Sequence, residues 1–509
     1  MKINLLEYFE ETVQSYPDRL AVREGELSIN FAQLYEAVLH LSGYIVKSLG
    51  GVFNKPIAVF LPKCIQSVKA DLAITFSGNF YMNLDIRYPE TRIKNILNLI
   101  KPTLIITNAG YKLKIKELSG NIPILNVDEL DLNYLFDKIS LWERLNRIID
   151  TDPYCLINTS GSTGTPKGVI LNHRSFIDFT EWAVKTLGIT DNEIVGSLSP
   201  LIFDIYSFEI CMLMARGSTI ILIPESLSAF PLNILKLLQQ TSVSFIFWVP
   251  TIMVNIANMD LLSRMHLSSL RMVWFAGEVF PTKQFNYWYR FLPQTKFVNL
   301  YGPIEITLDC TYFIVNRPLK DDEPIPIGFP CRNTDVLILN DENNLVKTEE
   351  EGELCVRGSS LAMGYYNNSD KTTAAFTQNP LNTSYPEIVY RTGDIVSRNS
   401  LNEIIFRGRK DSLVKHLGYR IELGEIEHVI VNTLKLANNC CVIYDSTKRE
   451  IVLFYESANE LDISEFRREI STVFPKYMIP NCYIKMEVLP KNINGKIDRL
   501  VLNNKVNGR

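Results

Sequence analysis

The 509-residue sequence has little that would place it outside the cell, in a membrane or around a structural metal. Its nine cysteines are scattered, only Cys440 and Cys441 are adjacent, and no CxxC pair occurs. This usage argues against a disulfide framework and a zinc site, and it predicts reduced thiols. The N-terminal stretch MKINLLEYFEETV carries acidic residues early, and apolar runs such as 245–249 are only of strand length. We therefore expect neither a signal peptide nor a membrane span, and a cytoplasmic protein.

An excess of charge of one sign is also lacking. The chain has 56 acidic and 52 basic residues, and no Lys/Arg block is interleaved with aromatic residues, so nucleic acid is not an expected partner. Hydrophobic residues make up 46% of the sequence. At this length they supply more than one core, and we expect at least two domains.

Two patterns follow each other along the chain. From Pro56 to about Pro303, strand-length apolar runs alternate with segments of helical periodicity, which predicts βαβ units and parallel sheet. From about Glu323 to Arg407, short strands are separated by Gly, Asn and Pro. The predicted fold class is α/β. A large N-terminal domain, 1–410, has βαβ-built mixed sheets plus an antiparallel subdomain, and a small mobile α+β C-terminal domain, 411–509, follows.

The segment Thr159–Gly168, TSGSTGTPKG, has the composition of a phosphate-binding loop. Its glycines let the backbone turn sharply and approach a ligand, its hydroxyl side chains are donors, and Lys167 adds a mobile positive charge. The segment is not a Walker A motif, because Gly168 rather than Ser or Thr follows Lys167. For this segment in isolation, a Gly/Ser/Thr surface loop is the alternative interpretation.

Five further segments follow this loop in order. They are NLYGPIE at 299–305, YRTGD at 390–394, GRKD at 408–411, GYRIELGEIE at 418–427 and NGKIDR at 494–499. Over nearly the whole chain, the set resembles the adenylate-forming superfamily. Within it, the set is similar to the amino-acid adenylation domains of nonribosomal peptide synthetases and the D-alanine–carrier protein ligases. The resemblance implies an AMP-forming amino acid–[carrier protein] ligase that uses ATP and Mg²⁺.

The resemblance also assigns expected roles to residues of these motifs. Lys496 would bridge the substrate carboxylate and the α-phosphate, Tyr301 would stack on adenine, and Asp394 would accept bonds from the ribose hydroxyls. Without their motifs, these three would be a solvated turn lysine, a packed aromatic and a turn aspartate. The expected catalytic residues are Lys496, Glu305 (also the Mg²⁺ ligand) and Lys167, and the expected nucleotide-binding residues are Thr159, Ser160, Gly161, Ser162, Thr163, Gly164, Thr165, Gly277, Glu278, Tyr301, Gly302, Asp394 and Arg409.

One position departs from the family pattern. Ile304 stands where the family usually has a threonine whose hydroxyl contacts the α-phosphate. Loss of one donor would cost about 1–3 kcal/mol of stabilisation. Thr307 is close in sequence, but nothing in the sequence shows that it replaces the missing donor. Either activity is modest or another donor compensates.

The segment 203–209, FDIYSFE, resembles the part of amino-acid-activating members in which an aspartate pairs with the α-ammonium group. An N-cap role for Asp204 is the alternative. Three large aromatic side chains predict a compact substrate, and the pattern resembles freestanding prolyl-activating members. Proline is therefore favoured, with alanine or serine next. Serine is included because serine-selecting members can carry Asp at the position of Asp309, and side-chain volume excludes neither alanine nor glycine. The expected substrate-binding residues are Asp204, Ile205, Phe208, Phe247, Trp274, Ala276, Leu300, Leu308 and Asp309.

The acceptor of the activated amino acid is expected on another chain. The sequence ends 13 residues after Lys496, and its LGG at 49–51 lacks the serine that carries phosphopantetheine. This predicts a freestanding enzyme and a discrete phosphopantetheinylated carrier protein. In the family the small domain swings about a hinge at the position of Asp411 and brings the 418–427 segment to the active site.

Two other functions compete with this interpretation. An acyl- or aryl-CoA synthetase of the same superfamily is disfavoured by Asp204, which fatty-acid and aryl-acid relatives lack. A noncatalytic nucleotide-binding relative is suggested only by Ile304. It is disfavoured because the chain retains Lys167, Glu305, Asp394 and Lys496.

Overall fold

The computed structural model describes residues 2–131, 133–159, 166–410, 413–437, 439–456, 462–491 and 497–508. Contacts within the chain divide it into two units. The large unit comprises Met1–Ile86, Lys101–Ile157 and Val169–Gly408, and the small unit comprises Arg87–Ile100, Asn158–Gly168 and Arg409–Arg509. The expected boundary and hinge residue, Asp411, lies outside the described residues, so this boundary stays a prediction.

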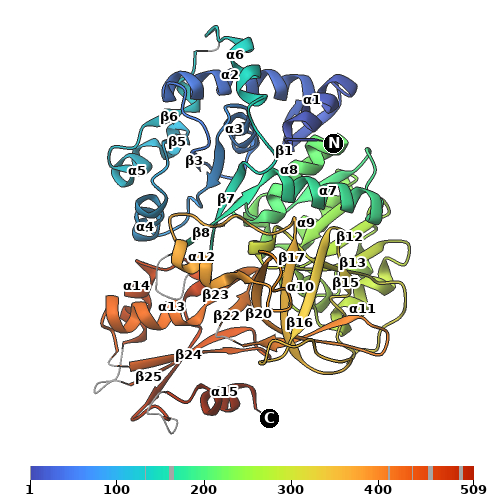
Figure 1. Ribbon diagram of the computed structural model, residues 1–509, viewed down its shortest axis with the longest axis vertical. Coiled ribbons are helices and arrows are strands. Elements are labelled where there is room, and N and C mark those ends of the chain that lie inside the picture. Colours follow the sequence, from blue (N-terminus) through green and yellow to red (C-terminus); the bar gives the residue numbers. More distant parts are fainter. Residues whose placement is uncertain are drawn as a thin grey trace. The chain divides into compact units, whose positions relative to one another are not determined.

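The large unit contains a mixed sheet of nine strands, counted over the described residues. Figure 1 labels its strands β1, β12, β13 and β15. Its strands from β13 to β1 run parallel, and antiparallel strands close both edges. The sequence predicted the parallel part, but it did not single out the antiparallel edges. In sheet order the strands are β15 (Phe329–Pro330), β14 (Thr311–Ile314), β13 (Lys296–Tyr301), β12 (Met272–Phe275), β11 (Phe245–Trp248), β9 (Ile194–Ser197), β10 (Thr219–Leu222), β1 (Leu20–Glu24) and β2 (Leu27–Asn30).

A second sheet contains the remaining predicted βαβ strands. Its order, over the described part of the chain, is β18 (Gly364–Tyr365), β8 (Lys167–Asn172), β7 (Pro153–Thr159), β4 (Phe80–Asn83), β3 (Pro56–Phe60), β5 (Leu104–Thr107) and β6 (Ile124–Asn126). The neighbours from β7 to β6 pair in parallel. β3, β4 and β5 are buried along their whole length, as expected for parallel strands covered on both faces.

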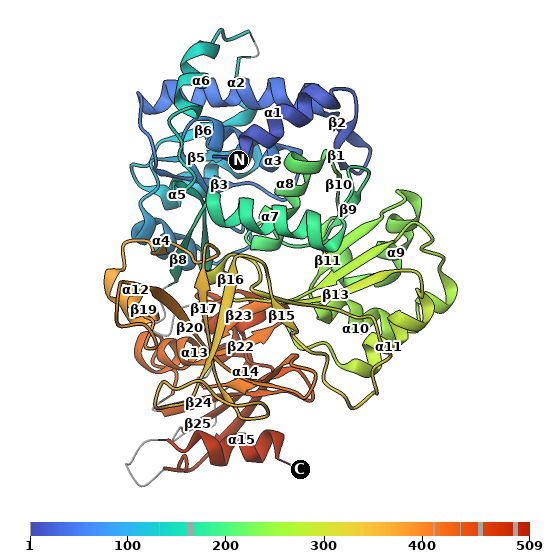
Figure 2. The same cartoon turned by 45° about the vertical axis from the view of Figure 1, so that its right-hand side comes forward.

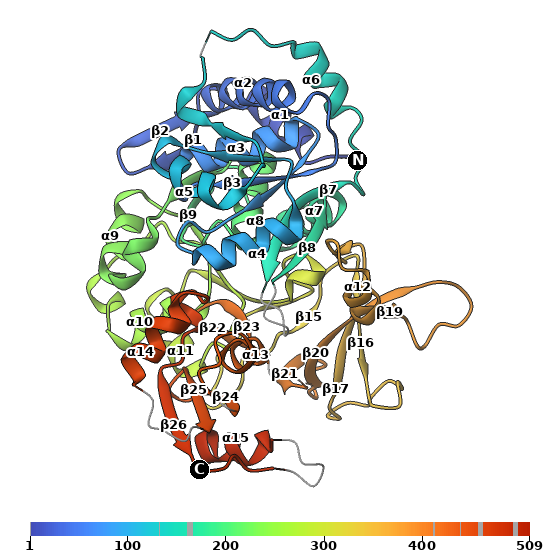
Figure 3. The same ribbon diagram turned by 90° about the vertical axis from the view of Figure 1, so that its left-hand side faces the viewer.

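The predicted antiparallel subdomain is confirmed as a separate sheet of the large unit (Figure 3). Its described strands are β16 (Thr334–Leu339), β17 (Gly352–Gly358), β20 (Ile388–Arg398), β19 (Phe376–Gln378) and β21 (Ile404–Arg409). The long strand β20 pairs with β17, β19 and β21. It therefore places Asp394 in the middle of this sheet.

The small unit contains two further described sheets. A hairpin consists of β22 (Leu413–His416) and β23 (Tyr419–Glu422), and a second sheet has the order β24 (Asn439–Asp445), β25 (Glu450–Glu456), β26 (Cys482–Met486). The core of the small unit contains Ile421, Ile426 and Val442.

The α-helices of the described chain are α1 (Leu6–Ser15), α2 (Phe31–Leu49), α3 (Ile65–Phe76), α4 (Glu90–Ile100), α5 (Ala109–Ser119), α6 (Lys138–Leu145), α7 (His173–Leu187), α8 (Asp204–Arg216), α9 (Pro231–Gln240), α10 (Pro250–Asn258), α11 (Thr282–Phe291), α12 (Ser369–Ala375), α13 (Leu423–His428), α14 (Ile463–Ser471) and α15 (Arg499–Asn507).

The central strands of the nine-stranded sheet present different side chains to its two faces. Successive strand residues point to opposite faces, and Trp248, Val273 and Phe297 belong to one hydrophobic cluster. The same cluster contains residues of α9, α10 and α11, which are grouped beside β11 and β13 in Figure 2. Phe247 and Trp274, which pair in register, lie on the other face. On this second face, Phe208 of α8 contacts both rings.

The helices of the described residues are all too short or too polar to cross a lipid bilayer.

Several helices begin and end with recognisable caps. Asn30 and Gln33 form a capping box at the start of α2, and Gly50 ends this helix in the left-handed conformation. Asn172 caps α7 by accepting the Ser175 N–H, and Gly188 ends it. These signals explain why α7 begins at His173 and ends at Leu187, within the part of the chain where the sequence predicts alternating strands and helices.

A carboxyl group is fully buried in α3. Asp71 accepts hydrogen bonds from Asn83 Nδ2 and from the Tyr206 hydroxyl, both at 3.1 Å, through Oδ2. Its Oδ1 atom is buried and has no partner among the described residues. Burial raises the pKa of Asp71 to about 7, against the lowering effect of these two donors. The folded protein therefore favours the protonated acid below neutral pH.

Replacing Asp71 with Asn should stabilise the protein increasingly as the pH rises from about 4 to about 7. The folded-state pKa lies above the ordinary value of 3.8, so the folded state holds a proton that the unfolded state releases, and wild-type stability falls across this window. Asparagine imitates the protonated acid and removes a penalty on the order of 1–4 kcal/mol at pH 8. Thermal midpoints at pH 4.5, 6 and 8 measure this difference.

The exposed Asp370 provides the matched control, because Asp370→Asn should leave the pH dependence of the midpoint unchanged. A constant difference between Asp71→Asn and wild type at all three pH values would mean that Asp71 is ionised in the folded protein.

Candidate active site

The predicted adenine- and ribose-binding residues lie next to each other. Tyr301 is the last residue of β13, and its hydroxyl donates a hydrogen bond to Asp394 Oδ2. Thr392 Oγ1 accepts the backbone N–H of Asp394 at 3.0 Å. Burial, followed by the negative charge of Asp394, raises the pKa of the Tyr301 phenol well above its usual value. Tyr301 thus stays a proton donor, and it fixes one oxygen of the carboxylate that is expected to bind ribose.

The turn after Tyr301 brings the backbone close to itself. A side chain on Gly302 would place Cβ 2.3 Å from the Leu308 oxygen and 2.5 Å from Asp309 Cα, so only glycine fits. Glu305 is completely buried, and its Oε1 accepts a hydrogen bond from the Tyr365 hydroxyl at 2.8 Å. Tyr365 comes from the short strand β18 and belongs to none of the six motifs, so no sequence pattern pointed to it.

Glu305 is compatible with the expected Mg²⁺ site. Within the described residues, no group of three His, Cys, Asp or Glu side chains is placed to hold a metal ion. Mg²⁺ is commonly bound by one or two carboxylates together with substrate phosphates rather than by a cage of protein ligands. A single buried carboxylate oriented by a tyrosine hydroxyl fits this mode, and Glu305 remains the predicted ligand.

The departure at Ile304 has a structural context. Ile304 is buried and supplies no hydroxyl, but Thr307 Oγ1, three residues on, is buried and has no hydrogen-bond partner among the residues described. Thr307 and Leu308 have φ values of 53° and 63°. Two consecutive non-glycine residues in this region represent backbone strain, which accumulates at functional sites. Thr307 thus holds a buried hydroxyl donor without a described partner in the same motif.

Gly277 and Glu278 follow β12. Gly277 has a φ of 91°, which favours glycine. Glu278 Oε2 accepts hydrogen bonds from the backbone N–H of Thr251, at 3.0 Å, and from the Thr251 hydroxyl. Thr251 lies in the first turn of α10, so Glu278 neutralises the N-terminus of this helix. No sequence motif pointed to Thr251.

The phosphate loop is described only at its ends. Thr159 ends β7 and is partly buried, Lys167 begins β8, and Ser160–Thr165 lie outside the described residues. Lys167 Nζ forms an ion pair with Glu422 Oε1 at 2.7 Å within the small unit. Lys496 also lies outside the described residues, and Arg409 ends β21 in a partly buried position. The roles predicted for these residues therefore stay predictions.

Three of the residues predicted to surround the substrate form one aromatic cluster. The rings of Phe208 and Trp274 are stacked, with centroids 5.6 Å apart and planes at 18°. Phe247 meets both rings edge-on, at 6.2 Å from Phe208 and 5.6 Å from Trp274. All three side chains are fully buried. The three rings thus pack against one another as part of the core, and their contact with a substrate stays a prediction.

The other predicted lining residues are buried or partly buried. Asp204 is the first residue of α8, and its Oδ1 accepts the N–H of Ile205 at 2.9 Å. The N-cap position is occupied by Phe203, so the alternative N-cap role of Asp204 is wrong, although its carboxylate still lies at the positive end of this helix. The fully or nearly buried residues are Ile205, Ala276, Leu300, Leu308 and Asp309.

The Trp274 indole has one polar atom without a hydrogen bond. Its Nε1 is buried and has no partner within the described ranges. By contrast, the buried Trp248 and Trp288 donate to the carbonyl oxygens of Gly196 and Met253, both at 2.9 Å. Buried donors are nearly always paired. The exception falls on a residue that the sequence places beside the substrate.

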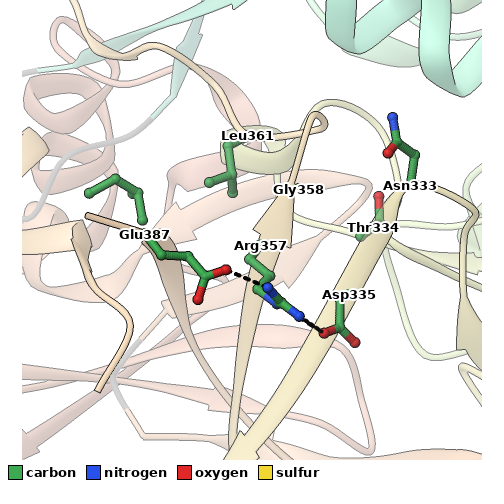
Figure 4. Close-up of a pocket in the computed structure, with 8 residues that line it drawn as sticks. Asn333, Thr334, Asp335, Arg357, Gly358, Leu361 and Glu387 are labelled. Carbon is green, nitrogen blue, oxygen red and sulfur yellow. Dashed lines mark hydrogen bonds and ion pairs between the residues drawn. The ribbon is translucent and has the colours of Figure 1, made fainter. Parts of the chain in front are cut away.

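A separate cleft of about 560 Å³ lies over the antiparallel subdomain. As Figure 4 shows, Arg357 points between two carboxylates, and it forms ion pairs with Asp335, at 2.8 Å, and with Glu387. The cleft therefore presents no net positive charge to an anionic ligand. It is lined by Asn333, Thr334, Asp335, Arg357, Gly358, Leu361, Glu387 and Ile388, none of which is a predicted site residue.

The sequence profile of the AMP-binding enzymes matches residues 9–366. Tyrocidine synthase 1 from Brevibacillus parabrevis is 28% identical over 502 residues, which cover 97% of this chain and 44% of that protein. The chain covers 36% of another curated relative, and thus spans less than half the length of both.

Two solved structures show the same fold. One is the Vibrio cholerae adenylation domain AlmE in complex with glycyl-adenosine-5'-phosphate, with a TM-score of 0.86, 20% identity and coverage of 99% of this chain and 98% of that chain. The other is a double mutant of o-succinylbenzoate CoA synthetase (MenE) from Bacillus subtilis, with a TM-score of 0.83, 18% identity and coverage of 99% and 98%.

Proposed function

The chain belongs to the family of AMP-binding enzymes, and we propose that it activates a compact α-amino acid with ATP as the aminoacyl-AMP. The aminoacyl group then passes to the phosphopantetheine thiol of a carrier protein, as the resemblance to peptide-synthetase adenylation domains implies. The observation that carries the amino-acid assignment is the Asp204 carboxylate, at the N-terminus of the helix that supplies Phe208 to the aromatic cluster.

The first half-reaction is attack of the substrate carboxylate on the α-phosphate of ATP, with loss of pyrophosphate. A carboxylate is ionised at neutral pH, so no general base is needed, and the residues have only to position and neutralise charge. Asp394, held by Tyr301, would receive the ribose. Lys167 would neutralise the β- and γ-phosphates and Lys496 the α-phosphate. Mg²⁺ bound by Glu305 would neutralise further phosphate charge.

Asp204 would pair with the α-ammonium group of the substrate. A carboxylate placed at a helix N-terminus is stabilised by the N–H groups there, and a nearby ammonium completes its neutralisation. Proline remains our first choice of substrate, because the aromatic cluster limits side-chain volume and a protonated secondary amine still offers two N–H donors. Alanine and serine are next.

One observation favours serine as a second candidate. The unpaired Nε1–H of Trp274 is a donor that a substrate hydroxyl can satisfy, whereas proline and alanine have no side-chain acceptor. Asp309 is nearly fully buried and would accept from the same hydroxyl. A site built to bond a hydroxyl discriminates strongly against analogues that lack it.

The alternative of an acyl- or aryl-CoA synthetase shares this fold, as the likeness to o-succinylbenzoate CoA synthetase illustrates. Fold therefore does not separate the two activities, and the decision rests on the site. A substrate without an ammonium group would leave Asp204 facing an apolar chain, which is unfavourable for a carboxylate. In a noncatalytic nucleotide-binding protein, Lys167 and Glu305 would have no catalytic role.

Amino-acid-dependent exchange of labelled pyrophosphate into ATP, over all common amino acids and a fatty-acid control, should give the strongest signal with a compact amino acid. Asp204→Ala and Asp204→Asn should both lower this exchange at least a hundredfold, since breaking a buried ion pair costs about 3–5 kcal/mol. Asparagine keeps the acceptor for the Ile205 N–H and loses only the charge. Exchange that survives in Asp204→Asn, or a preference for the fatty acid, would contradict the assignment.

Trp274→Phe distinguishes the two leading substrates, because it removes the Nε1–H and keeps an aromatic ring in the cluster. If serine is the substrate, the kcat/KM of its exchange should fall about tenfold or more, as expected for loss of a hydrogen bond in a buried site. The kcat/KM for proline should change little. A parallel fall for both amino acids would show that the indole acts through packing alone.

Lys496→Ala should lower the exchange rate by about a hundredfold or more, while the Kd for ATP stays within a few-fold, because the lysine neutralises charge that develops in the transition state. Calorimetric ATP titration and the exchange assay measure the two effects. Lys491→Ala, a nearby exposed lysine, is the control and should behave as wild type. Equal losses in binding and turnover would refute a transition-state role for Lys496.

A further inference from the structure

The hairpin of the 418–427 segment contacts the phosphate loop directly. Glu422 is the last residue of β23 and is paired across the hairpin with Leu413. Its carboxylate lies 2.7 Å from Lys167 Nζ, and the exposed fractions of the two side chains are 11% and 15%. The ammonium expected to hold the β- and γ-phosphates of ATP is therefore engaged by a protein carboxylate.

A second ion pair holds the same segment in a different way. Glu425, in α13, pairs with Arg92 of α4 at 3.2 Å, and the exposed fractions are 0% and 6%. Breaking such a buried pair leaves a charge without water and is strongly unfavourable. The Lys167–Glu422 pair retains access to solvent, so its ammonium can exchange one anion for another at lower cost. The two pairs thus combine a firm attachment with an exchangeable one.

We propose that Glu422 is a positioning residue that competes with the phosphates of ATP for Lys167. The proposal rests on the proposed function, because it takes Lys167 as the phosphate-binding lysine. An ammonium has three donors and one charge, and a triphosphate with several negative charges attracts it more strongly than one carboxylate. ATP binding therefore separates Lys167 from Glu422, and the pair forms again when pyrophosphate leaves.

This competition links the state of the phosphates to the hairpin β22–β23. Linkage is reciprocal: a ligand that takes Lys167 weakens the attachment of Glu422 to the loop, and a hairpin held through Glu422 weakens phosphate binding by the same factor. Release of pyrophosphate would thereby strengthen the attachment of Glu422 to Lys167. Glu422 belongs to the 418–427 segment, which is expected to serve thioester formation.

Calorimetric titrations with Mg-ATP and with Mg-pyrophosphate test the competition without requiring turnover. Glu422→Gln removes the charge, preserves the shape, and should lower the Kd of both ligands about threefold to tenfold, the range expected for a partly exposed ion pair. Glu422→Asp, which restores the charge, should return the Kd toward the wild-type value. An unchanged or higher Kd in Glu422→Gln would overturn the proposal.

Two further variants separate competition from a general effect on folding. Glu456→Gln removes another carboxylate of the small unit, one that accepts the Leu489 N–H, and it should leave both Kd values unchanged. In the Lys167→Gln background, Glu422→Gln should have no additional effect, because the shared partner is gone. An equal effect of Glu422→Gln with and without Lys167 would show that Glu422 acts through the fold.

The pyrophosphate-exchange assay distinguishes failure of this proposal from failure of the proposed function. Suppose that Glu422→Gln binds Mg-ATP and Mg-pyrophosphate more tightly, but wild type shows no pyrophosphate exchange with any amino acid. This result would support the competition at Lys167 and contradict the proposed amino-acid activation. Active exchange together with an unaltered Kd would retain the function and reject the competition. Where both hold, Glu422→Gln should lower the KM for ATP without lowering kcat of exchange.

Discussion

Because β11, β12 and β13 run parallel with Phe247, Trp274 and Val298 in register, a single alternation of side chains serves two purposes. One set of residues builds the hydrophobic cluster with α9, α10 and α11, and the other set meets α8 on the opposite face. The carboxyl ends of β12 and β13 lead directly into the turns that contain Gly277, Glu278 and Gly302. Substrates of α/β sheets bind at these ends, so a one-residue shift in register would exchange core and site residues.

The sequence predicted the class of fold and most of the central elements, because parallel strands read as continuous apolar runs and helices as 3.6-residue periods. The runs IAVFLP, SFIFWVP and MVWFAG correspond to β3, β11 and β12. The distribution of these strands between two sheets was not predictable, since periodicity marks a strand but does not choose its neighbour. The antiparallel edge strands β14 and β15 were missed for the same reason.

At the site, local motifs identified residues but not their partners. Tyr301 and Asp394 were expected to serve the same nucleotide, and the structure adds the hydrogen bond between them. Tyr365, which orients Glu305, is 60 residues away in sequence, and Thr251, which binds Glu278, has no motif. Such contacts arise from tertiary packing, and no spacing rule along one chain encodes them. The assignments of the phosphate loop, the hinge and Lys496 rest on the motifs alone.

The consecutive left-handed residues Thr307 and Leu308 bear on how easily this site can be altered by protein engineering. Glycine or asparagine at position 308 would relieve backbone strain, because both tolerate positive φ better than leucine does. The same changes would remove an aliphatic side chain from the residues expected to contact the substrate. Because Leu308 is buried, the lost packing would cost about 2–5 kcal/mol and outweigh the strain relieved, so a library screened for stability would retain leucine and deplete β-branched residues at this position. Stability and selectivity are thus coupled at this one backbone position.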